Sequence, residues 1–242
     1  MSKCLLILGA SSDVGTGLIE RIHSEYDVIL AHYRSPSEKL EQLKNKMPDK
    51  IKLLQADFSS LEATDAFIKT VLEEYPPPTH IVHLSADRFK YGRFAKKEWQ
   101  DIENDLNIQL RSAYKIISGC IGSMAKAKYG KIVFMLTTCT VNVPKYLVDY
   151  TTVKFALLGF MKALATDYAD KKICVNAVSP SMIETKFLDG ISHLTVEQTA
   201  AASPLKRNAT VEDILPSIEF LLSDKSDYMT GQNIVVAGGS AI

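Results

Sequence analysis

Seven short apolar runs recur along the chain, and segments with apolar residues at every third or fourth position separate most of them. The runs are rich in Val, Ile and Leu, which is typical of parallel strands that are buried on both faces. They lie at residues 4–8, 27–33, 51–56, 81–84, 130–137, 173–178 and 233–237. Strands that alternate with helices predict a parallel sheet of about seven strands with helices on both faces, and therefore an α/β fold.

Capping signals indicate where several helices begin. Ser35-Pro36-Ser37-Glu38 combines a capping box with a proline at the first helical position, and predicts a helix to about Met47. Ser59–Glu62 predicts a second capped helix, which the prolines at 76–78 end. Further helices are expected at about 97–126, 150–169 and 210–222, and a loop with short helical pieces at 180–207. Because no linker or repeat divides these elements, residues 1–242 are expected to form a single domain.

The stretch Gly130–Lys154 carries the candidate chemistry. Its strand ends near Thr137, and Tyr150 and Lys154 lie four residues apart at the start of a helix, so both side chains share one helix face. A lysine ammonium close to a phenol favours the phenolate and lowers the tyrosine pKa, which allows proton exchange near neutral pH. With a threonine hydroxyl beside the pair, these residues predict an acid–base site on one wall of a cofactor cleft.

The first strand leads into a glycine-rich turn and then into a helix. The turn reads Gly9-Ala10-Ser11-Ser12-Asp13-Val14-Gly15-Thr16-Gly17. A turn of this kind brings backbone N–H groups to a pyrophosphate at the helix N-terminus. Its position at the start of the chain favours dinucleotide binding over an ordinary strand–helix turn.

The charge balance argues against several classes of partner. Lys and Arg total 28 and Asp and Glu also total 28, so nothing favours nucleic acid or an anionic membrane. The four cysteines have no CxxC spacing and are expected as core thiols of a reducing compartment, three in strands and one in a helix: Cys4, Cys120, Cys139 and Cys174. We predict no metal site. The apolar run at the start is too short for a signal peptide and no run of about 18 apolar residues follows, so we expect a soluble cytoplasmic protein.

Five motifs, in their order and separations, resemble the classical short-chain dehydrogenase/reductases over nearly the whole chain. Among these the bacterial 3-oxoacyl-[acyl-carrier-protein] reductases are the most similar. The motifs are the turn at 9–15, Asp57 after the third strand, Tyr150-x-x-x-Lys154, the stretch 176–185 (NAVSPSMIET) and the ending 228–239 (YMTGQNIVVAGG). The resemblance implies a single Rossmann-type domain with a doubly wound parallel sheet, and an NAD(P)-dependent oxidoreductase acting on CH–OH or C=O groups.

The resemblance also implies catalytic roles. Tyr150 would give a proton to the substrate carbonyl oxygen, and Thr137 would hydrogen-bond the same oxygen. Lys154 would lower the Tyr150 pKa and bind the nicotinamide ribose. The relay asparagine of the family aligns with Gln109 when counted back from Gly130, and Gln109 could hold a relay water or serve packing.

Cofactor-binding residues follow from the same resemblance. Asp57 would cap the adenine, and Thr185 would hold the nicotinamide carboxamide. The full implied set is Gly9, Ser11, Ser12, Asp13, Val14, Gly15, Arg34, Ser35, Asp57, Phe58, Ser85, Tyr150, Lys154, Pro180, Ile183 and Thr185.

Several residues depart from the family pattern. Asp13 replaces the middle glycine of the turn, where a carboxylate would repel a pyrophosphate unless it points away. The usual Asn-Asn-Ala-Gly after the fourth strand reads His83-Leu84-Ser85-Ala86, and we interpret His83 as a packed core residue. Thr137 stands where the family has serine and adds a methyl group. These departures leave open a second hypothesis, a non-catalytic cofactor-binding or scaffold subunit.

Cofactor and substrate preferences depend on fewer residues. The second strand ends in His32-Tyr33-Arg34-Ser35 without an acidic residue for the ribose 2′-OH, so Arg34 could meet a 2′-phosphate, and NADPH is favoured over NADH. The expected substrate is a small carbonyl compound, first a 3-oxoacyl thioester on acyl carrier protein, with Lys128 and Lys171 near the cleft. Another alcohol or sugar-derivative dehydrogenase is the alternative. Family members pair through their two long helices, so we expect a homo-oligomer, either a dimer or a tetramer.

Overall fold

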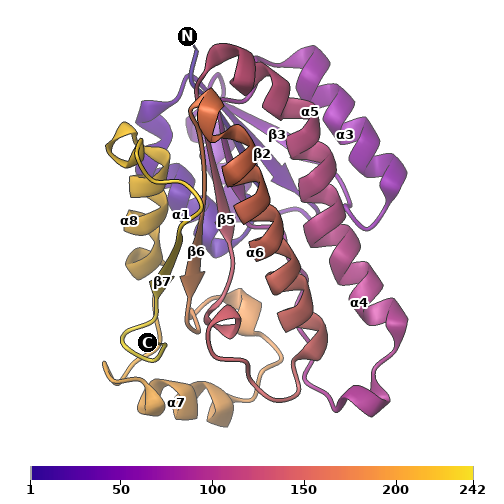
Figure 1. The fold of residues 1–242 in the computed structure, drawn as a ribbon, viewed down its shortest axis with the longest axis vertical. Helices are drawn as coiled ribbons and strands as arrows, with labels where there is room; N and C mark the ends of the chain where they lie inside the picture. Colours follow the sequence, from indigo (N-terminus) through magenta and orange to yellow (C-terminus); the bar gives the residue numbers. More distant parts are fainter. Residues whose placement is uncertain (1, 242) are drawn as a thin grey trace.

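The computed structural model describes residues 2–241, which form one seven-stranded parallel sheet between two layers of helices (Figure 1). The strand order is β3-β2-β1-β4-β5-β6-β7. The strands are β1 Cys4–Leu8, β2 Val28–Tyr33, β3 Ile51–Gln55, β4 His80–His83, β5 Gly130–Met135, β6 Ile173–Pro180 and β7 Asn233–Val236. The predicted α/β fold with a doubly wound parallel sheet is confirmed.

Helices cover both faces of this sheet. They are α1 Asp13–Ile22, α2 Glu38–Lys46, α3 Leu61–Glu74, α4 Trp99–Asp105, α5 Ser112–Ala127, α6 Val148–Tyr168, α7 His193–Ala202 and α8 Val211–Leu222. Successive strand residues point to opposite faces, so Leu6 of β1 packs with α3, α5 and α6, whereas Leu5 packs with α1, α2 and α8. Each face therefore has its own apolar core.

Two helices begin later than the capping signals predict. The N-cap of α2 is Ser37 rather than Ser35, since the Ser37 hydroxyl accepts a hydrogen bond from the Leu40 N–H at 3.4 Å. The N-cap of α3 is Ser60 rather than Ser59. In both cases two nearby serines fit the same capping signal. The helix begins at the serine that places its apolar side chains toward the core.

The helix expected at 97–126 contains an irregular stretch. A π-helical segment, Leu106–Arg111, joins α4 to α5 and has wider turns than an α-helix. Within it the side chains of Ile108 and Gln109 are buried. One widened turn hardly changes the apolar periodicity of a long helix, which is why the sequence predicts a regular one.

One further expectation needs correction. Cys139 lies in a 3₁₀ turn, Thr138–Thr140, rather than in a strand, and it is half-buried. The stretch 180–207 contains helical pieces, as expected, and the longest is the ten-residue helix α7, which has no buried residue. Weak apolar periodicity is the consequence of that exposure, because a helix without a core face needs no apolar stripe.

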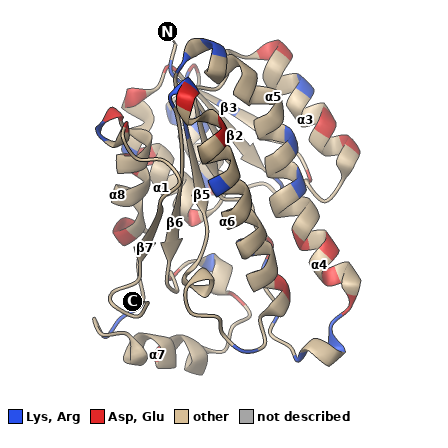
Figure 2. Ribbon diagram, in the orientation of Figure 1, with Lys and Arg blue, Asp and Glu red and all other residues tan. Residues whose placement is uncertain are grey.

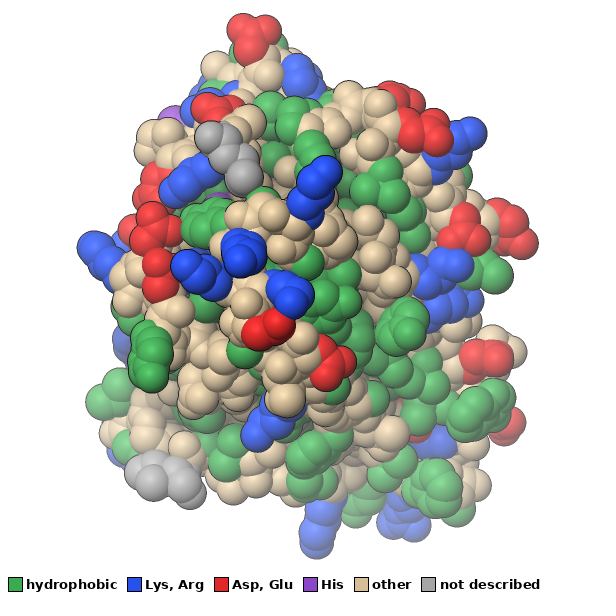
Figure 3. Space-filling view, turned by 45° about the horizontal axis from the view of Figure 1, so that its top comes forward, with side chains coloured by type: hydrophobic (Ala, Val, Ile, Leu, Met, Phe, Trp, Pro, Cys, Tyr) green, Lys and Arg blue, Asp and Glu red, His purple; other side chains and the backbone are tan. Residues whose placement is uncertain are grey.

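No helix between residues 2 and 241 is both long enough and apolar enough to cross a membrane. Acidic and basic residues are interspersed over the helices of both layers (Figure 2), and on the face seen in Figure 3 they alternate with apolar side chains. This mixed distribution accompanies the zero formal net charge.

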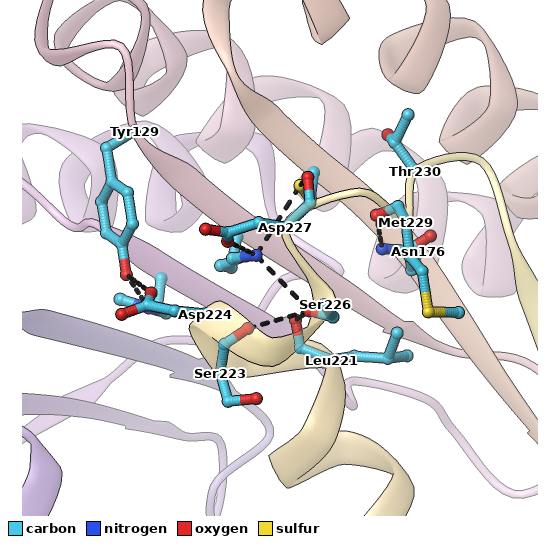
Figure 4. Close-up of polar contacts among 12 residues, drawn as sticks. Tyr129, Asn176, Leu221, Ser223, Asp224, Ser226, Asp227, Met229 and Thr230 are labelled. Atoms are coloured by element: carbon cyan, nitrogen blue, oxygen red, sulfur yellow. Dashed lines mark hydrogen bonds and ion pairs between the residues drawn. The ribbon is translucent and has the colours of Figure 1, made fainter.

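A cluster of polar contacts connects the loop before β7, residues 226–229, to β5 and β6 (Figure 4). Lys131 of β5 is 1% exposed, and its ammonium contacts the Asp227 carboxylate at 2.5 Å and the Ser226 hydroxyl at 3.4 Å. Asn176 of β6 donates to the Met229 carbonyl at 2.7 Å. The carboxylate offsets the cost of burying the ammonium. These contacts attach the loop to β5 and β6 on the side away from the carboxyl ends of these strands.

The same end of the sheet contains a fully partnered histidine. His80 of β4 shares a hydrogen bond with the Thr79 hydroxyl at 2.9 Å through Nδ1, and one with the Tyr129 hydroxyl at 3.3 Å through Nε2. Burial lowers the pKa of His80 to about 4, so its ring is neutral near pH 7. Both nitrogens of a buried imidazole thus have partners here.

Candidate active site

A cleft opens at the carboxyl ends of the strands, where the strand order reverses between β1 and β4. Connections that leave β1 and β4 run in opposite directions at such a switch point, and the diverging loops leave a crevice. The cleft has a volume of about 1270 Å³, and a neighbouring cavity of about 230 Å³ shares part of its lining.

The structure brings most of the predicted site residues together around these two spaces. The cleft is lined by Ser11, Ser12, Asp13, Val14, Arg34, Ser35, Thr137, Tyr150, Lys154, Pro180, Ile183 and Thr185. The smaller cavity adds Gly9, Asp57, Phe58 and Ser85. Segments from seven parts of the chain therefore converge at one edge of the sheet, as the motifs predicted.

The turn after β1 is packed too tightly for side chains at two positions. Gly9 has φ +85°, and a Cβ there would lie 2.9 Å from the Ser85 amide nitrogen. A Cβ at Gly15 would lie 2.6 Å from the Ala10 carbonyl oxygen. The Ser12 hydroxyl caps α1 by accepting from the Gly15 N–H at 3.1 Å. This packing brings the positive end of α1 to the cleft, where it favours an anionic group.

His32 supports this turn from within the sheet, a role that no sequence signal indicated. Its Nδ1 accepts from the Gly9 N–H at 3.0 Å, and its Nε2 donates to the Ala56 carbonyl at 3.1 Å. The ring stacks on Phe58 with the centroids 3.9 Å apart. Burial lowers the pKa of His32 to about 4. The imidazole is therefore neutral and can accept one hydrogen bond while it donates the other.

Polar groups collect around the smaller cavity. The Arg34 guanidinium pairs with Asp87 at 3.5 Å, and because the side chains are 49% and 34% exposed, this pair is readily exchanged for another partner. Asp57 accepts from the Ser59 N–H at 2.9 Å. The buried Ser85 hydroxyl has no hydrogen-bond partner within the described chain. These groups suit a polar ligand.

Tyr150, Lys154 and Thr137 meet at the other end of the cleft. The Lys154 Nζ lies 5.6 Å from the centre of the Tyr150 ring and donates to the Met135 carbonyl at 3.1 Å. The Thr137 Oγ1 accepts from the Cys139 N–H at 3.2 Å, which leaves its own proton for another acceptor. The predicted acid–base group thus has the expected neighbours.

The electrostatics of Tyr150 differ from the sequence prediction. Burial raises the pKa of Tyr150 above its ordinary value, and the Thr137 hydroxyl opposes this only in part. Burial also lowers the pKa of Lys154 to about 8, while the Asp105 carboxylate acts in the opposite direction. In the chain by itself the Tyr150 pKa thus shifts upward, opposite to the direction that its spacing from Lys154 predicts, because desolvation of the phenol is the largest cause. The lowering of this pKa by Lys154 stays a prediction.

Four residues lie elsewhere than in the cleft lining. Gln109 is fully buried behind the cleft, and Gly15 packs against Ala10. Lys128 and Lys171 lie at the end of α5 and in the 3₁₀ turn before β6, next to the amino ends of β5 and β6. The expectation that these lysines lie near the cleft is wrong, because the connections into parallel strands lie at the opposite edge of the sheet.

Asp13 points away from the turn and toward the loop after β6. Its carboxylate accepts from the Lys186 N–H at 2.9 Å. Arg88 holds the same loop by donating to the Lys186 carbonyl at 3.2 Å and to the Asp189 carboxylate at 3.1 Å. The repulsion expected between Asp13 and a pyrophosphate is reduced, because the carboxylate is already engaged.

Aromatic side chains form the wall beside Tyr150. The Phe89 ring lies 5.0 Å from the Tyr150 ring, 5.5 Å from Tyr91 and 5.7 Å from Phe187, centroid to centroid. All four rings line the cleft, so this side suits an apolar group. Nothing in the sequence marked Phe89 or Tyr91, because they lie in a segment without periodicity. Among the residues that the structure describes, no group of three or more His, Cys, Asp or Glu side chains could hold a metal ion.

Comparisons with known proteins agree with this geometry. A family model described as enoyl-(acyl carrier protein) reductase matches residues 9–241. The chain belongs to the short-chain dehydrogenase/reductase family. It is 27% identical over 237 residues to Nodulation protein G of Rhizobium sp. (strain N33), covering 98% of this chain and 96% of that protein. It is also 27% identical over 246 residues to 3-oxoacyl-[acyl-carrier-protein] reductase FabG of Staphylococcus aureus, covering 99% and 98%.

Solved structures share the short-chain dehydrogenase/reductase fold. A short-chain type dehydrogenase/reductase from Mycobacterium ulcerans has a TM-score of 0.87 at 21% identity and covers 98% of this chain and 89% of its own. ElxO with bound NADP has a TM-score of 0.86 at 21% identity and covers 99% of both chains. Family membership makes this chain an NAD(P)-dependent oxidoreductase.

Substitution Gly15→Ala should damage the turn that begins α1. The added methyl group would lie 2.6 Å from the Ala10 carbonyl oxygen, so the start of α1 must move away from the strand. Misplaced N–H groups lose hydrogen bonds to an anion worth about 1.5–3 kcal/mol each, so we expect the dissociation constant of the reduced nicotinamide cofactor, NAD(P)H, to rise by roughly tenfold or more. Fluorescence titration with NADH and with NADPH measures this change.

Gly122→Ala in α5 is the matched control, because a Cβ there meets nothing within 4 Å. It should leave NAD(P)H affinity unchanged and stabilise the helix by about 0.5–1 kcal/mol. An unchanged NAD(P)H affinity in Gly15→Ala would show that the turn tolerates a side chain.

Proposed function

We propose that this chain reduces a ketone with NADPH, and that the ketone is a 3-oxoacyl thioester. The observation that carries the proposal is the convergence of Tyr150, Lys154 and Thr137 on one wall of a cleft that also contains the glycine turn. The similarity to a 3-oxoacyl-[acyl-carrier-protein] reductase over almost the whole chain supports the choice of substrate.

The residues present fit a nicotinamide dinucleotide. The turn at Gly9 and Gly15 leaves space where side chains would stand, beside the positive end of α1, and would receive the pyrophosphate. Asp57 and the unpartnered Ser85 hydroxyl would hold the adenosine in the smaller cavity. The nicotinamide end would contact residues near the end of β6, namely Pro180, Ile183 and Thr185. When bound, the cofactor supplies hydride to the carbonyl carbon.

The chain itself supplies the proton and fixes the carbonyl group. Tyr150 is protonated at neutral pH, since an ordinary phenol has a pKa near 10 and burial raises the pKa of Tyr150 further, so it holds a proton to donate. Its hydroxyl gives the proton to the substrate oxygen as negative charge develops there. Thr137 donates a hydrogen bond to the same oxygen. The buried ammonium of Lys154 stabilises the phenolate that remains.

The aromatic wall favours an acyl chain over a sugar derivative. Phe89 and Phe187 would leave sugar hydroxyls without hydrogen-bond partners, which is costly when they are buried. An acyl chain gains about 0.8 kcal/mol for each CH₂ group that it buries there. Arg88 and Lys186 are exposed on the same side and would offer positive charge to an acidic carrier protein.

We infer that copies of the chain associate through α5 and α6. Tyr114 on α5 and Phe155 on α6 are 60% and 43% exposed, which is a large apolar surface to leave in water. Val235 on the edge strand β7 is also exposed and would allow two dimers to meet. Sedimentation of the purified chain should give a dimer or tetramer, and a monomer would contradict this inference.

The central test follows NADPH absorbance with an acetoacetyl thioester as the substrate. We expect turnover in the unaltered chain and a loss of about 10²–10⁴-fold in Tyr150→Phe, because the proton donor is removed. Tyr146→Phe is the matched control, since Tyr146 is 51% exposed in the preceding loop and should keep full activity. Tight NADPH binding without turnover of this thioester or of a ketone panel would contradict the proposed reaction.

Cofactor preference is tested at Arg34. Arg34→Ala should raise the KM for NADPH by about 10- to 100-fold, since a hydrogen bond between charged groups is worth about 1.5–3 kcal/mol. The KM for NADH should change little. Asp87→Asn releases Arg34 from its pair and should lower the KM for NADPH. Equal losses with both cofactors, measured from initial rates, would show that Arg34 does not meet the 2′-phosphate.

A further inference from the structure

The aromatic wall beside Tyr150 belongs to a segment with little regular structure. Between β4 and α4 the chain forms one short 3₁₀ turn, Phe94–Lys96, and most side chains of the segment 88–97 are exposed. Such a segment has no ladder of backbone hydrogen bonds and few buried contacts to hold it in place. The positions of Phe89 and Tyr91 therefore depend on a small number of contacts with the rest of the chain.

Lys97 is the charged residue of this segment that is withdrawn from solvent. Its side chain is 9% exposed, and its ammonium lies 2.7 Å from the Asp149 carboxylate, whose side chain is 11% exposed. The same ammonium donates to the Lys90 carbonyl at 2.7 Å. Its carbon chain packs against Gly92, where a Cβ would lie 3.1 Å from the Lys97 Cε. Lys97 thus folds the segment back on itself and attaches it to the first turn of α6.

A backbone hydrogen bond attaches the segment at a second point. The Gly92 N–H donates to the Tyr146 carbonyl at 2.9 Å. Tyr146 and Asp149 both come shortly before Tyr150, where α6 begins, at the lower end of that helix in Figure 1. The wall and the proton donor are therefore attached to the same few residues, and the Phe89 ring lies 5.0 Å from the Tyr150 ring.

The other ion pairs of the segment are exposed. Lys90 pairs with Asp101 at 3.2 Å, and these side chains are 76% and 36% exposed. Arg88 pairs with Asp189 at 3.1 Å, and these are 57% and 61% exposed. Ion pairs in water contribute little to stability, whereas breaking a buried pair leaves one charge in the interior without a counterion. The buried pair is therefore the contact that decides where the segment lies.

We propose that Lys97, through its ion pair with Asp149, is a positioning residue that sets the preference of the cleft for longer acyl chains. The inference rests on the proposed function, in which the aromatic wall contacts the acyl chain of the substrate. The pair holds Phe89 at a fixed place relative to the hydroxyl of Tyr150, so a chain that packs on Phe89 has its ketone beside the proton donor. A chain too short to reach the wall gains nothing from it. Neither residue of the pair lines the cleft, so both act only through the wall.

Lys97→Met tests the proposal, because methionine keeps much of the carbon chain and removes the ammonium. Initial rates are measured with NADPH and two substrates, acetoacetyl thioester and its longer homologue 3-oxooctanoyl thioester. The unaltered chain should prefer the longer substrate in kcat/KM. Lys97→Met should lose about tenfold of that preference, the effect of about two CH₂ groups that no longer pack on the wall.

The loss should lie in the KM for the longer thioester. The kcat with acetoacetyl thioester and the KM for NADPH should stay unchanged, because Tyr150 and Lys154 keep their places on α6. Equal kcat/KM values for the two thioesters in the unaltered chain, or an unchanged ratio in Lys97→Met, would overturn the proposal.

Lys131→Met is the matched control. Lys131 also has a buried ammonium, with its side chain 2% exposed and paired with Asp227, but it lies near the start of β5, away from the cleft. Its loss should lower thermal stability and leave the ratio between the two thioesters unchanged. An equal change of this ratio in Lys131→Met and Lys97→Met would mean that lost stability is the cause, and would overturn the proposal.

A double variant covers the case in which Lys97→Met does not fold because Asp149 is left without its counterion. Lys97→Met/Asp149→Asn removes both charges and should show the same tenfold loss of preference, roughly, as Lys97→Met alone, since both substitutions break one contact. Losses from the two single substitutions that add up in the double variant would show that the residues act separately, which contradicts the proposal.

Amide hydrogen exchange tests the attachment of the wall without any turnover. The Gly92 N–H should be protected in the unaltered chain by its bond to the Tyr146 carbonyl, and it should exchange faster in Lys97→Met. Equal exchange of the segment 88–97 in both proteins would overturn the proposal. If the unaltered chain reduces no ketone, the proposed function fails, but exchange still decides whether Lys97 holds the wall in place.

Discussion

The buried ammonium of Lys154 is the group on which the geometry of the cleft depends. It is 3% exposed and donates to the Met135 carbonyl at the end of β5, so this contact connects the start of α6 to the sheet at the place where the charge is buried. A charge with so little access to water is tolerated only where polar groups surround it. Polar side chains therefore occupy positions behind the cleft that an ordinary core would fill with apolar ones.

A single cause gives the two central residues their ionisation states. Burial disfavours the charged form of any group, so it lowers the pKa of Lys154 and raises that of Tyr150. The sequence motif shows that Tyr150 and Lys154 lie four residues apart, but it does not show how far they are removed from water. Burial, rather than the attraction between the two groups, is the main cause of both pKa shifts.

The sheet could be predicted because strands buried on both faces leave continuous apolar runs, and most of the cleft lining could be predicted because the motifs lie where those strands end. Contacts between distant segments could not be predicted. His32 supports Gly9 across 23 residues, and Phe89 meets Phe187 from another loop. The start of α2 was predicted two residues too early for a different reason. Ser35 and Ser37 both fit the N-cap signal in the sequence, and the structure uses Ser37. The π-helical segment that contains Gln109 could not be predicted either, because one widened turn hardly changes the spacing of apolar residues along a long helix.

Three interior histidines make the fold sensitive to acid. Burial lowers the pKa of His32, His80 and His83 to about 4, 4 and 3, well below the value near 6.5 of an unfolded chain. Between about pH 6.5 and pH 4, these histidines are protonated in the unfolded chain but remain neutral in the folded chain. The free energy of unfolding therefore falls by about 1.4 kcal/mol per pH unit for each histidine as the pH is lowered. Three sites on two strands, β2 and β4, contribute to the same titration, which makes the loss of stability steep. A chain with this interior keeps its fold in a neutral medium and loses it progressively in an acidic one.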